Sequence, residues 1–257
     1  MRIMLTGYSG RMGRAVIEAA AYKSDEFSIV VGVAIDPAAI NMTFPVFLTP
    51  SEYDEPLDMI IDFSHHSMID SLLEYAKNKK IPAVIATTGH TPKEIELIKA
   101  YSEHIALFKS ANMSVGVNLV AGLAKKAAMI LKDDFDIEIT ERHHNQKLDA
   151  PSGTALMLAD EISSAFDSFE KPEYIYDRHN IRRVRAKKEI GIHAIRGGTI
   201  IGDHEVIFAG TNELITISHS AQSREMFANG ALSAARFLRG KPPGLYSMKD
   251  LINEITN

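Results

Sequence analysis

The chain has 257 residues, a formal net charge of −5, and neither cysteine nor tryptophan. This length suffices for one large or two modest domains, of which two are expected, and the lack of cysteine excludes disulfides, thiol nucleophiles and thiolate metal sites. There is no extended basic patch, no leader-like start and no apolar run near the ~18 residues of a membrane span. We therefore expect a cytoplasmic protein with no nucleic-acid partner and no membrane partner.

The chain opens with a pattern typical of phosphate-binding loops. Arg2 to Thr6 read as a short buried strand, and an apolar face from Val16 to Ala20 predicts a helix through about Tyr22. The turn between them, Gly7-Tyr8-Ser9-Gly10-Arg11-Met12-Gly13, departs from the commonest dinucleotide pattern only at Ser9, which replaces its second glycine. Strand, glycine turn and helix together favour a cofactor site over an ordinary turn.

A second strand, Ile29 to Ile35, ends at Asp36. This carboxylate lies roughly 20 residues beyond the glycine turn, where it would accept hydrogen bonds from ribose hydroxyls. The next residue is Pro37 rather than a basic residue, which favours NADH. Arg11 or Arg14 could still reach a 2′-phosphate, so use of both cofactors stays open.

Strands and helices then alternate, which predicts a parallel sheet. Buried strands are expected at Met59 to Phe63, Ala83 to Ala86 and Ile105 to Phe108, with a helix around Met68 to Lys77 and another beginning in the capping box that starts at Thr91.

Two polar connections follow these strands. Ala86-Thr87-Thr88-Gly89 lies at the carboxyl edge of the sheet, where it is equally well a ligand contact or a capped turn. Lys109 to Ser114 precedes a helical stretch from Val117 to Leu131, and we expect the chain to cross there into a second domain.

Beyond the crossover, polar and apolar residues alternate with period two. This pattern covers Asp136 to Glu141 and parts of Glu205 to Phe208 and Leu214 to Ser218, and predicts a sheet with one face solvated or facing a partner. A final helix, Met226 to Leu238, should return to the first domain. The expected domains are residues 1–114 with 224–257, and residues 115–223. The basic segment Arg178 to Lys188 is interpreted as a solvated loop that could face an acidic ligand.

The segment from Arg142 to Ala155 carries the densest chemistry. It contains the neighbouring His143 and His144, which suit proton transfer near neutral pH, and Lys147, which could bind an anion or give up a proton. Ser152 is a good cap for a helix from Gly153 to Phe166, whose first amides could bind a carboxylate. Adjacent histidines on a strand point to opposite faces and no third ligand follows, so no metal site is expected. His193, His204 and His219, each taken alone, read as structural residues.

This segment also carries a resemblance. Glu141-Arg-His-His-Asn-Gln-Lys147 with Asp149-Ala-Pro-Ser-Gly-Thr154 resembles the signature of the dihydrodipicolinate reductase family, also called 4-hydroxy-tetrahydrodipicolinate reductases. The resemblance covers most of the chain except residues 38 to 56. It extends through Gly7 to Gly13, Asp62-Phe-Ser64, Ala86 to Gly89, Ala111 to Asn118, Ile195-Arg-Gly-Gly198 and Phe227 to Gly230.

The resemblance implies an α/β fold, with an N-terminal Rossmann-type dinucleotide-binding domain and an α+β substrate and tetramerisation domain built on a mixed sheet. It implies a homotetramer and a small dicarboxylate substrate. The implied reaction transfers hydride from NADH or NADPH to C4 of a cyclic imine dicarboxylate, with loss of the 4-hydroxyl as water, in diaminopimelate and lysine biosynthesis. An acid must protonate the ring carbon next to C4.

Site residues carry over by position. His143 resembles the proton donor and Lys147 a second donor, both catalytic, while His144, Gly153 and Thr154 resemble substrate contacts. Arg224 is either a surface residue or a hinge or cofactor contact, and Met113 replaces an aromatic residue found in some members. The implied cofactor residues are Gly7, Tyr8, Ser9, Gly10, Arg11, Met12, Asp36, Ala86, Thr87, Thr88, Ser110, Ala111, Asn112 and Met113.

Two other readings stay open. A related amino-acid dehydrogenase would share the dinucleotide half but leaves the segment from His143 to Thr154 unexplained. A non-catalytic NAD(H)-binding sensor would need the glycine turn but no proton donor.

Overall fold

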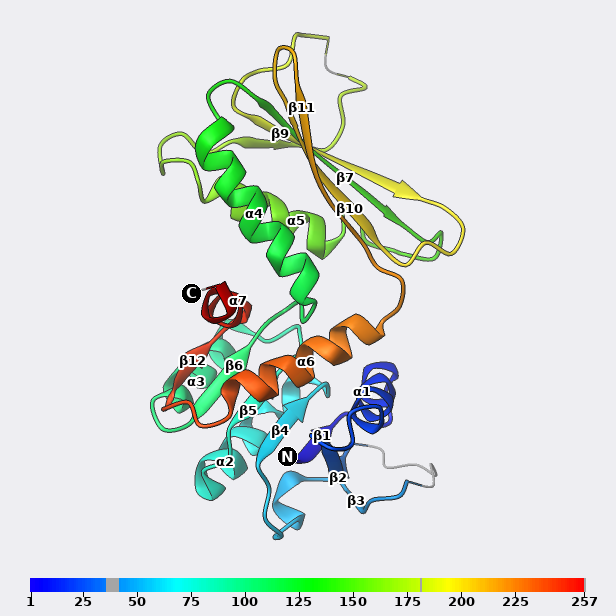
Figure 1. Ribbon diagram of the computed structural model, residues 1–257, viewed down its shortest axis with the longest axis vertical. Coiled ribbons are helices and arrows are strands. Elements are labelled where there is room, and N and C mark those ends of the chain that lie inside the picture. Colours follow the sequence, from blue (N-terminus) through cyan, green and yellow to red (C-terminus); the bar gives the residue numbers. More distant parts are fainter. Residues whose placement is uncertain (36–41, 181, 257) are drawn as a thin grey trace. The chain divides into compact units, whose positions relative to one another are not determined.

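The computed structural model describes residues 1–35, 42–180 and 182–256. The chain divides into two compact units (Figure 1): unit 1 comprises Met1–Val115 and Arg224–Asn257, and unit 2 comprises Gly116–Ser223. Within the described ranges, no helix has both the length and the apolar character that crossing a bilayer requires.

Unit 1 is built on a seven-stranded sheet in which every pairing is parallel, in the order β12-β6-β5-β4-β1-β2-β3. The apolar, β-branched strands are buried on both faces, as a parallel sheet requires. The α/β Rossmann-type architecture expected for this half is confirmed. The strands are β1 (Arg2–Thr6), β2 (Ser28–Val33), β3 (Val46–Phe47), β4 (Met59–Asp62), β5 (Ala83–Ile85), β6 (Ala106–Lys109) and β12 (Gly244–Tyr246).

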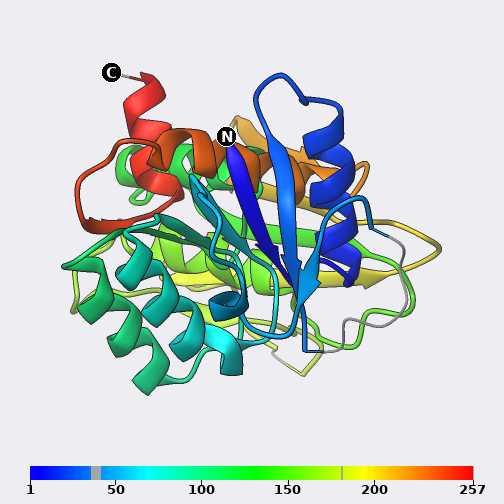
Figure 2. The same ribbon diagram turned by 90° about the horizontal axis from the view of Figure 1, so that it is seen from below.

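Helices cover both faces of this sheet (Figure 2), so that it has two cores. Leu5 packs in the core shared with α1, α6 and α7, whereas Met4, the preceding residue, packs in the core shared with α2 and α3. The expected capping box begins α3, where the Thr91 hydroxyl accepts from the Glu94 amide (3.3 Å) and the Glu94 carboxylate accepts from the Thr91 amide (2.6 Å). The helices are α1 (Arg11–Ala21), α2 (Ile69–Lys79), α3 (Pro92–Ser102), α6 (Glu225–Leu238) and α7 (Met248–Thr256), with short 3-10 turns at Pro50–Glu52 and His66–Met68.

Unit 2 contains a five-stranded mixed sheet in the order β11-β10-β7-β9-β8. Strand β7 pairs antiparallel with β10 and parallel with β9, so the mixed sheet implied by the family resemblance is confirmed. The strands are β7 (Asp136–His143), β8 (Glu173–Ile175), β9 (Glu189–Arg196), β10 (Asp203–Ala209) and β11 (Leu214–Ser220).

Two helices, α4 (Val115–Leu131) and α5 (Gly153–Ser163), cover one face of the unit 2 sheet (Figure 1). Ile139 of β7 and Val206 of β10 are fully buried in that core. The alternate residues of β7 point to the other face, and they include Glu138, Thr140 and Arg142. The period-two alternation in the sequence therefore marks a sheet with one helix-covered face and one open, polar face.

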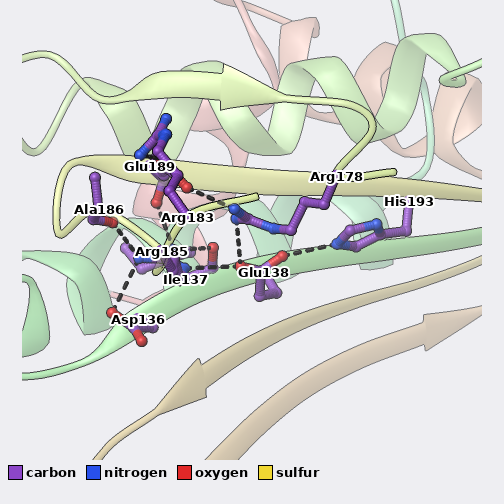
Figure 3. A network of polar contacts seen from close by, with 9 residues as sticks. All are labelled: Asp136, Ile137, Glu138, Arg178, Arg183, Arg185, Ala186, Glu189 and His193. Atoms are coloured by element: carbon purple, nitrogen blue, oxygen red, sulfur yellow. Dashed lines mark hydrogen bonds and ion pairs between the residues drawn. The ribbon is translucent and has the colours of Figure 1, made fainter. Parts of the chain in front are cut away.

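The basic segment is mostly exposed, as a solvated loop would be, but two of its arginines reach carboxylates of the sheet (Figure 3). Arg178 donates to Glu189 (2.7 Å) and Glu138 (3.3 Å), and Arg185 and His193 also contact Glu138, at 2.9 and 2.7 Å. Burial raises the pKa of Glu138, but Arg185 and His193 outweigh it and hold the pKa below its ordinary value. The solvated-loop interpretation is wrong for these arginines, because half-buried carboxylates on the sheet need nearby cations.

Candidate active site

Two glycines of the turn between β1 and α1 are required by the packing of unit 1, because a side chain at either position would clash with the backbone. Gly7 has a φ of +76°, and a Cβ there would lie 2.2 Å from the Phe63 carbonyl oxygen. A Cβ on Gly13 would lie 2.3 Å from the Gly7 carbonyl oxygen. Gly10 differs, because it is exposed at the start of α1 and a Cβ there would meet nothing closer than 3.4 Å. Its missing side chain leaves the first amides of α1 open to a ligand.

A cavity lies beside this turn. It brings together segments that the sequence singled out separately: the turn itself, the residues after β5 and the residues after β6. This is the carboxyl edge of the parallel sheet, where such folds bind ligands. The cavity is lined by Arg11, Met12, Phe63, Ser64, Ala86, Thr87, Thr88, Ala111, Met113, Arg224 and Phe227.

The remaining cofactor candidates have other surroundings. The Tyr8 side chain is fully buried, edge-on to Phe44 at 6.1 Å, so only its backbone is available to a ligand. The Ser110 hydroxyl donates to the Asn112 carbonyl (2.7 Å), and the Asn112 side chain accepts from the Ser114 amide (2.9 Å), so both shape the turn after β6. Gly7, Ser9 and Gly10 belong to the glycine turn without lining the cavity. Asp36 lies outside the described residues.

The lining suits an anionic dinucleotide. It contains two guanidinium groups, of Arg11 and Arg224, and neither is paired with a carboxylate of the described chain. Thr87 is buried, and its hydroxyl has no hydrogen-bond partner among the described residues. Positive charge, an orphaned hydroxyl and a helix start are the features that a pyrophosphate requires.

Phe63, Ser64 and Phe227 belong to motifs of the family resemblance, but nothing in the sequence predicted that they line a cavity. The part of the cavity wall at Ser64 is held by the buried Asp62, which accepts hydrogen bonds from the hydroxyls of Thr6 and Ser64 and from the Ser64 amide (3.1 Å). The sequence does contain a sign of this arrangement: Asp62 ends a buried strand, and a buried carboxylate must be surrounded by hydrogen-bond donors.

In unit 2, strand β7 carries Glu141 and His143 on the face that the helices cover. Glu141 is fully buried and accepts four hydrogen bonds: from His143 Nδ1 (2.6 Å), from the Ser152 amide (3.0 Å) and from both terminal nitrogens of Arg196 (2.8 Å each). Burial raises the pKa of Glu141, but Arg196, His143 and the Ser152 amide outweigh it and hold the pKa below its ordinary value. The carboxylate is therefore ionised.

The start of α5 lies beside this pair. Ser152 caps the helix, its hydroxyl accepting from the Ala155 amide (3.2 Å), and a Cβ on the exposed Gly153 would meet nothing within 4 Å. The Lys147 ammonium contacts the Asp149 carboxylate at 2.8 Å, and Lys147 lowers the pKa of that carboxyl. An ammonium and the start of a helix thus follow His143 within one short loop.

A second histidine packs on His143. The His204 ring lies edge-on to it with the centroids 5.2 Å apart, and His204 Nε2 contacts the Ser152 hydroxyl at 3.0 Å. Burial, followed by the nearby His143, lowers the pKa of His204 to about 4, so this ring is neutral near pH 7. In the ranges that the structure describes, no three His, Asp or Glu side chains are arranged to hold a metal ion.

Glu141 links His143 to Ser152, which caps α5 as expected; Lys147 lies in the loop between them, and Gly153 and Thr154 follow Ser152. His144 follows the end of β7 and its carbonyl accepts from the Lys147 amide (3.2 Å). Sequence reasoning missed Arg196, whose only signal was the quoted motif Ile195 to Gly198, and treated His204 as an isolated structural residue.

Comparisons with known proteins match the chain in two parts. Residues 1–113 match the family model described as dihydrodipicolinate reductase, N-terminus, and residues 116–252 match the model described as dihydrodipicolinate reductase, C-terminus.

Relatives match along nearly the full chain. A 4-hydroxy-tetrahydrodipicolinate reductase from Caldanaerobacter subterraneus is 50% identical over 254 residues, 99% of each chain. One from Clostridium tetani is 49% identical, covering 98% of this chain and 97% of its own. A dipicolinate-bound dihydrodipicolinate reductase from Paenisporosarcina sp. TG-14 shares the fold, with a TM-score of 0.80 at 22% identity over 96% of this chain and 97% of that one.

Proposed function

The chain belongs to the dihydrodipicolinate reductase family, and from this premise we propose that His143 in unit 2 is the group that protonates the substrate. The chain is an NAD(P)H-dependent oxidoreductase that reduces 4-hydroxy-tetrahydrodipicolinate to tetrahydrodipicolinate in diaminopimelate and lysine biosynthesis. The observation that carries the residue assignment is the hydrogen bond between His143 and a buried, ionised Glu141.

NADH or NADPH, when bound, supplies the hydride. Unit 1 offers the fitting surroundings, because its cavity is lined by Arg11 and Arg224, which suit an anion, and by Thr87, whose hydroxyl has no hydrogen-bond partner among the described residues. We assign the cofactor contacts to the glycine turn, with Tyr8 contributing backbone only, to Asp36, to Ala86–Thr88 and to Ser110–Met113. The division of roles, with cofactor on unit 1 and substrate on unit 2, is part of this proposal.

The substrate is a small dicarboxylate. The relative from Paenisporosarcina is described as dipicolinate-bound, and dipicolinate is a planar dicarboxylate of similar size. We assign one carboxylate to the start of α5, at Gly153 and Thr154, with Lys147 and His144 beside it. Cations and N–H donors are the groups that stabilise a dianion.

His143 and Lys147 share the proton chemistry. The 4-hydroxyl leaves as water with a hydrogen of the neighbouring ring carbon, which forms a C=C bond. Hydride addition at C4 of this conjugated imine then leaves the neighbouring carbon in need of a proton. His143 gives that proton, since its Nδ1 is occupied by Glu141 while its second nitrogen is not engaged with a carboxylate. Lys147, held by Asp149 at 2.8 Å, orients the carboxylate and serves as a second donor.

We further propose that the chain forms a homotetramer in the cytoplasm, with copies meeting at the unit 2 sheet. Strand β11 supports this, because it is an edge strand without a single buried residue, and its Leu214 is 65% exposed. Long exposed edges invite pairing unless something covers them.

The test is a coupled assay in which a synthase generates the substrate and NADH and NADPH oxidation are followed separately. We expect turnover by the wild type and a loss of kcat of at least about a hundredfold for His143→Gln, the usual cost of removing a general acid. NADH affinity should stay within about twofold, because His143 does not line the unit 1 cavity.

The matched control is His179→Gln, at an exposed histidine of the same unit. Near wild-type turnover of His143→Gln would remove His143 from its role. A wild type that binds NADH but turns over neither cofactor would instead favour the non-catalytic sensor.

A further inference from the structure

We propose that Glu141 is a positioning residue that fixes the tautomer of His143 and ties this proton donor to the carboxylate-binding start of α5. This inference rests on the proposed function, in which His143 is the donor.

The tautomer follows from the charge on Glu141. An ionised carboxylate can only accept hydrogen bonds, so the 2.6 Å contact requires that His143 Nδ1 carries a hydrogen. In the neutral ring Nε2 is then bare, and Nε2 is the atom that takes up a proton and passes it to the substrate carbon. A Cβ on Gly202 would lie 2.9 Å from His143 Nε2, so the glycine at that position keeps space open beside the transferring nitrogen.

The same carboxylate holds the anion site. The second oxygen of Glu141 accepts from the Ser152 amide (3.0 Å), and Ser152 is the residue that caps α5. Arg196 bridges both oxygens and also donates to the Asp149 carbonyl (2.7 Å), which fixes the loop between His143 and α5. One buried group therefore sets the spacing between the proton donor and the helix amides.

Glu141 also places a negative charge beside His143. The ionisable groups that face His143 are Glu141 from its own strand, Arg196 through Glu141 from β9, and the neutral His204 from β10. Glu141→Gln keeps the side-chain shape but removes the only negative charge among them. The Arg196 guanidinium is then uncompensated, which disfavours a protonated imidazole beside it.

The experiment compares kcat against pH for the wild type, Glu141→Gln and Glu141→Asp. For Glu141→Gln we expect kcat to fall about tenfold to a hundredfold and its alkaline limb to move to lower pH by at least about one unit. Glu141→Asp keeps the negative charge on a shorter side chain. The alkaline limb of its kcat–pH profile should therefore stay near that of the wild type, while kcat itself falls.

Glu189→Gln is the matched control. Glu189 is another buried carboxylate paired with arginines, but it lies at the opposite end of β9 from Arg196. A general loss of packing would affect both glutamine variants alike, whereas a positioning role predicts an unchanged pH profile for Glu189→Gln.

A second measurement needs no folded variant of Glu141. In ¹⁵N spectra of the wild type at alkaline pH, His143, assigned by the signal missing in His143→Gln, should carry its proton on Nδ1. A proton on Nε2 would overturn the inference. An inactive His143→Gln with an unchanged Glu141→Gln profile would also overturn it while leaving the proposed function intact, whereas a fully active His143→Gln would remove the proposed donor itself.

Discussion

Two ionisable side chains next to His143 are both buried, but Glu141 is charged whereas His204 is neutral. Glu141 stays charged because it has a guanidinium and two further N–H donors, whereas His204 has only the Ser152 hydroxyl and loses its charge. A neutral His204 leaves the ionised Glu141 as the dominant charge at His143. His143 thus lies beside one anion, Glu141, and a neutral ring.

The neutral His204 makes the fold sensitive to acid. Its pKa of about 4 lies below the ordinary value of 6.5, so the unfolded chain binds the proton first as pH falls. Stability is therefore full above about pH 6.5 and is lost as pH falls from 6.5 towards 4. The loss between pH 7 and 5 should be about 2 kcal/mol for this residue. Urea denaturation of the wild type and His204→Gln at both pH values measures it.

The comparison isolates His204 because the pKa of Glu141 is lowered and that carboxylate loses its contribution only below about pH 4.5. His204→Gln should be less stable at pH 7 but should lose about 2 kcal/mol less than the wild type on going to pH 5. Equal losses in the two proteins would show that His204 does not titrate in this way.

At this scale the sequence predicts residues but not their partners. His143, Lys147 and Ser152 lie in one segment, and their types alone suggest proton transfer beside an anion site. Arg196 lies 55 residues beyond Glu141, and only the pairing of His143 with Arg196 across β7 and β9 brings the guanidinium to the carboxylate. Such a contact is set by sheet register, which no local pattern encodes.

In the glycine turn between β1 and α1, Gly7 is needed for folding, whereas Gly10 is expected to matter for cofactor binding. Gly7→Ala introduces a Cβ at positive φ and 2.2 Å from a carbonyl oxygen, so we expect a loss of at least ~2 kcal/mol of stability. Gly10→Ala meets no such contact and should change stability by less than ~1 kcal/mol, yet lower NADH affinity about tenfold or more by blocking the helix start. Thermal unfolding and NADH fluorescence titration measure the two effects.

Gly122→Ala is the control for this pair. Gly122 is exposed within α4 of unit 2, and a Cβ there meets nothing within 4 Å. Alanine should raise stability by roughly 0.5–1 kcal/mol through helix propensity and leave NADH affinity unchanged. If Gly10→Ala bound NADH as well as Gly122→Ala does, the glycine turn would not be the phosphate site.

Elements with a clear hydrophobic pattern were predictable, and very short or irregularly buried ones were not. Strands β1, β2, β4, β5 and β6 of unit 1 were expected close to where they lie, because each is a short apolar run between turn residues. Strand β3 has two residues and β12 three, too few for any period. Strand β9 shows no alternation in its first half because Glu189 to Ile192 are all buried, with arginines covering the outer face.

At the scale of the whole molecule, the net charge says less about binding partners than the way the charges are paired. A net charge of −5 argued against a nucleic-acid partner, but it could not show that the cations of Arg178 to Arg185 neutralise the chain's own carboxylates. Those pairs join residues about 11 to 47 positions apart. A basic segment in a sequence is therefore an ambiguous sign until the partners of its arginines are known.

The proposed tetramer gives the last expectation. Leu214 of β11 is 65% exposed in the isolated chain, so Leu214→Asp should cost little stability on its own. If copies meet at this sheet, the added carboxylate is buried and unpaired in the contact, which disfavours assembly.

Light scattering after gel filtration should give four times the 28.4 kDa chain mass for the wild type and a smaller mass for Leu214→Asp. Ile255→Asp, at a residue 75% exposed in unit 1, is the control and should remain tetrameric. A monomeric wild type, or a Leu214→Asp variant that assembles as the control does, would contradict assembly through this strand.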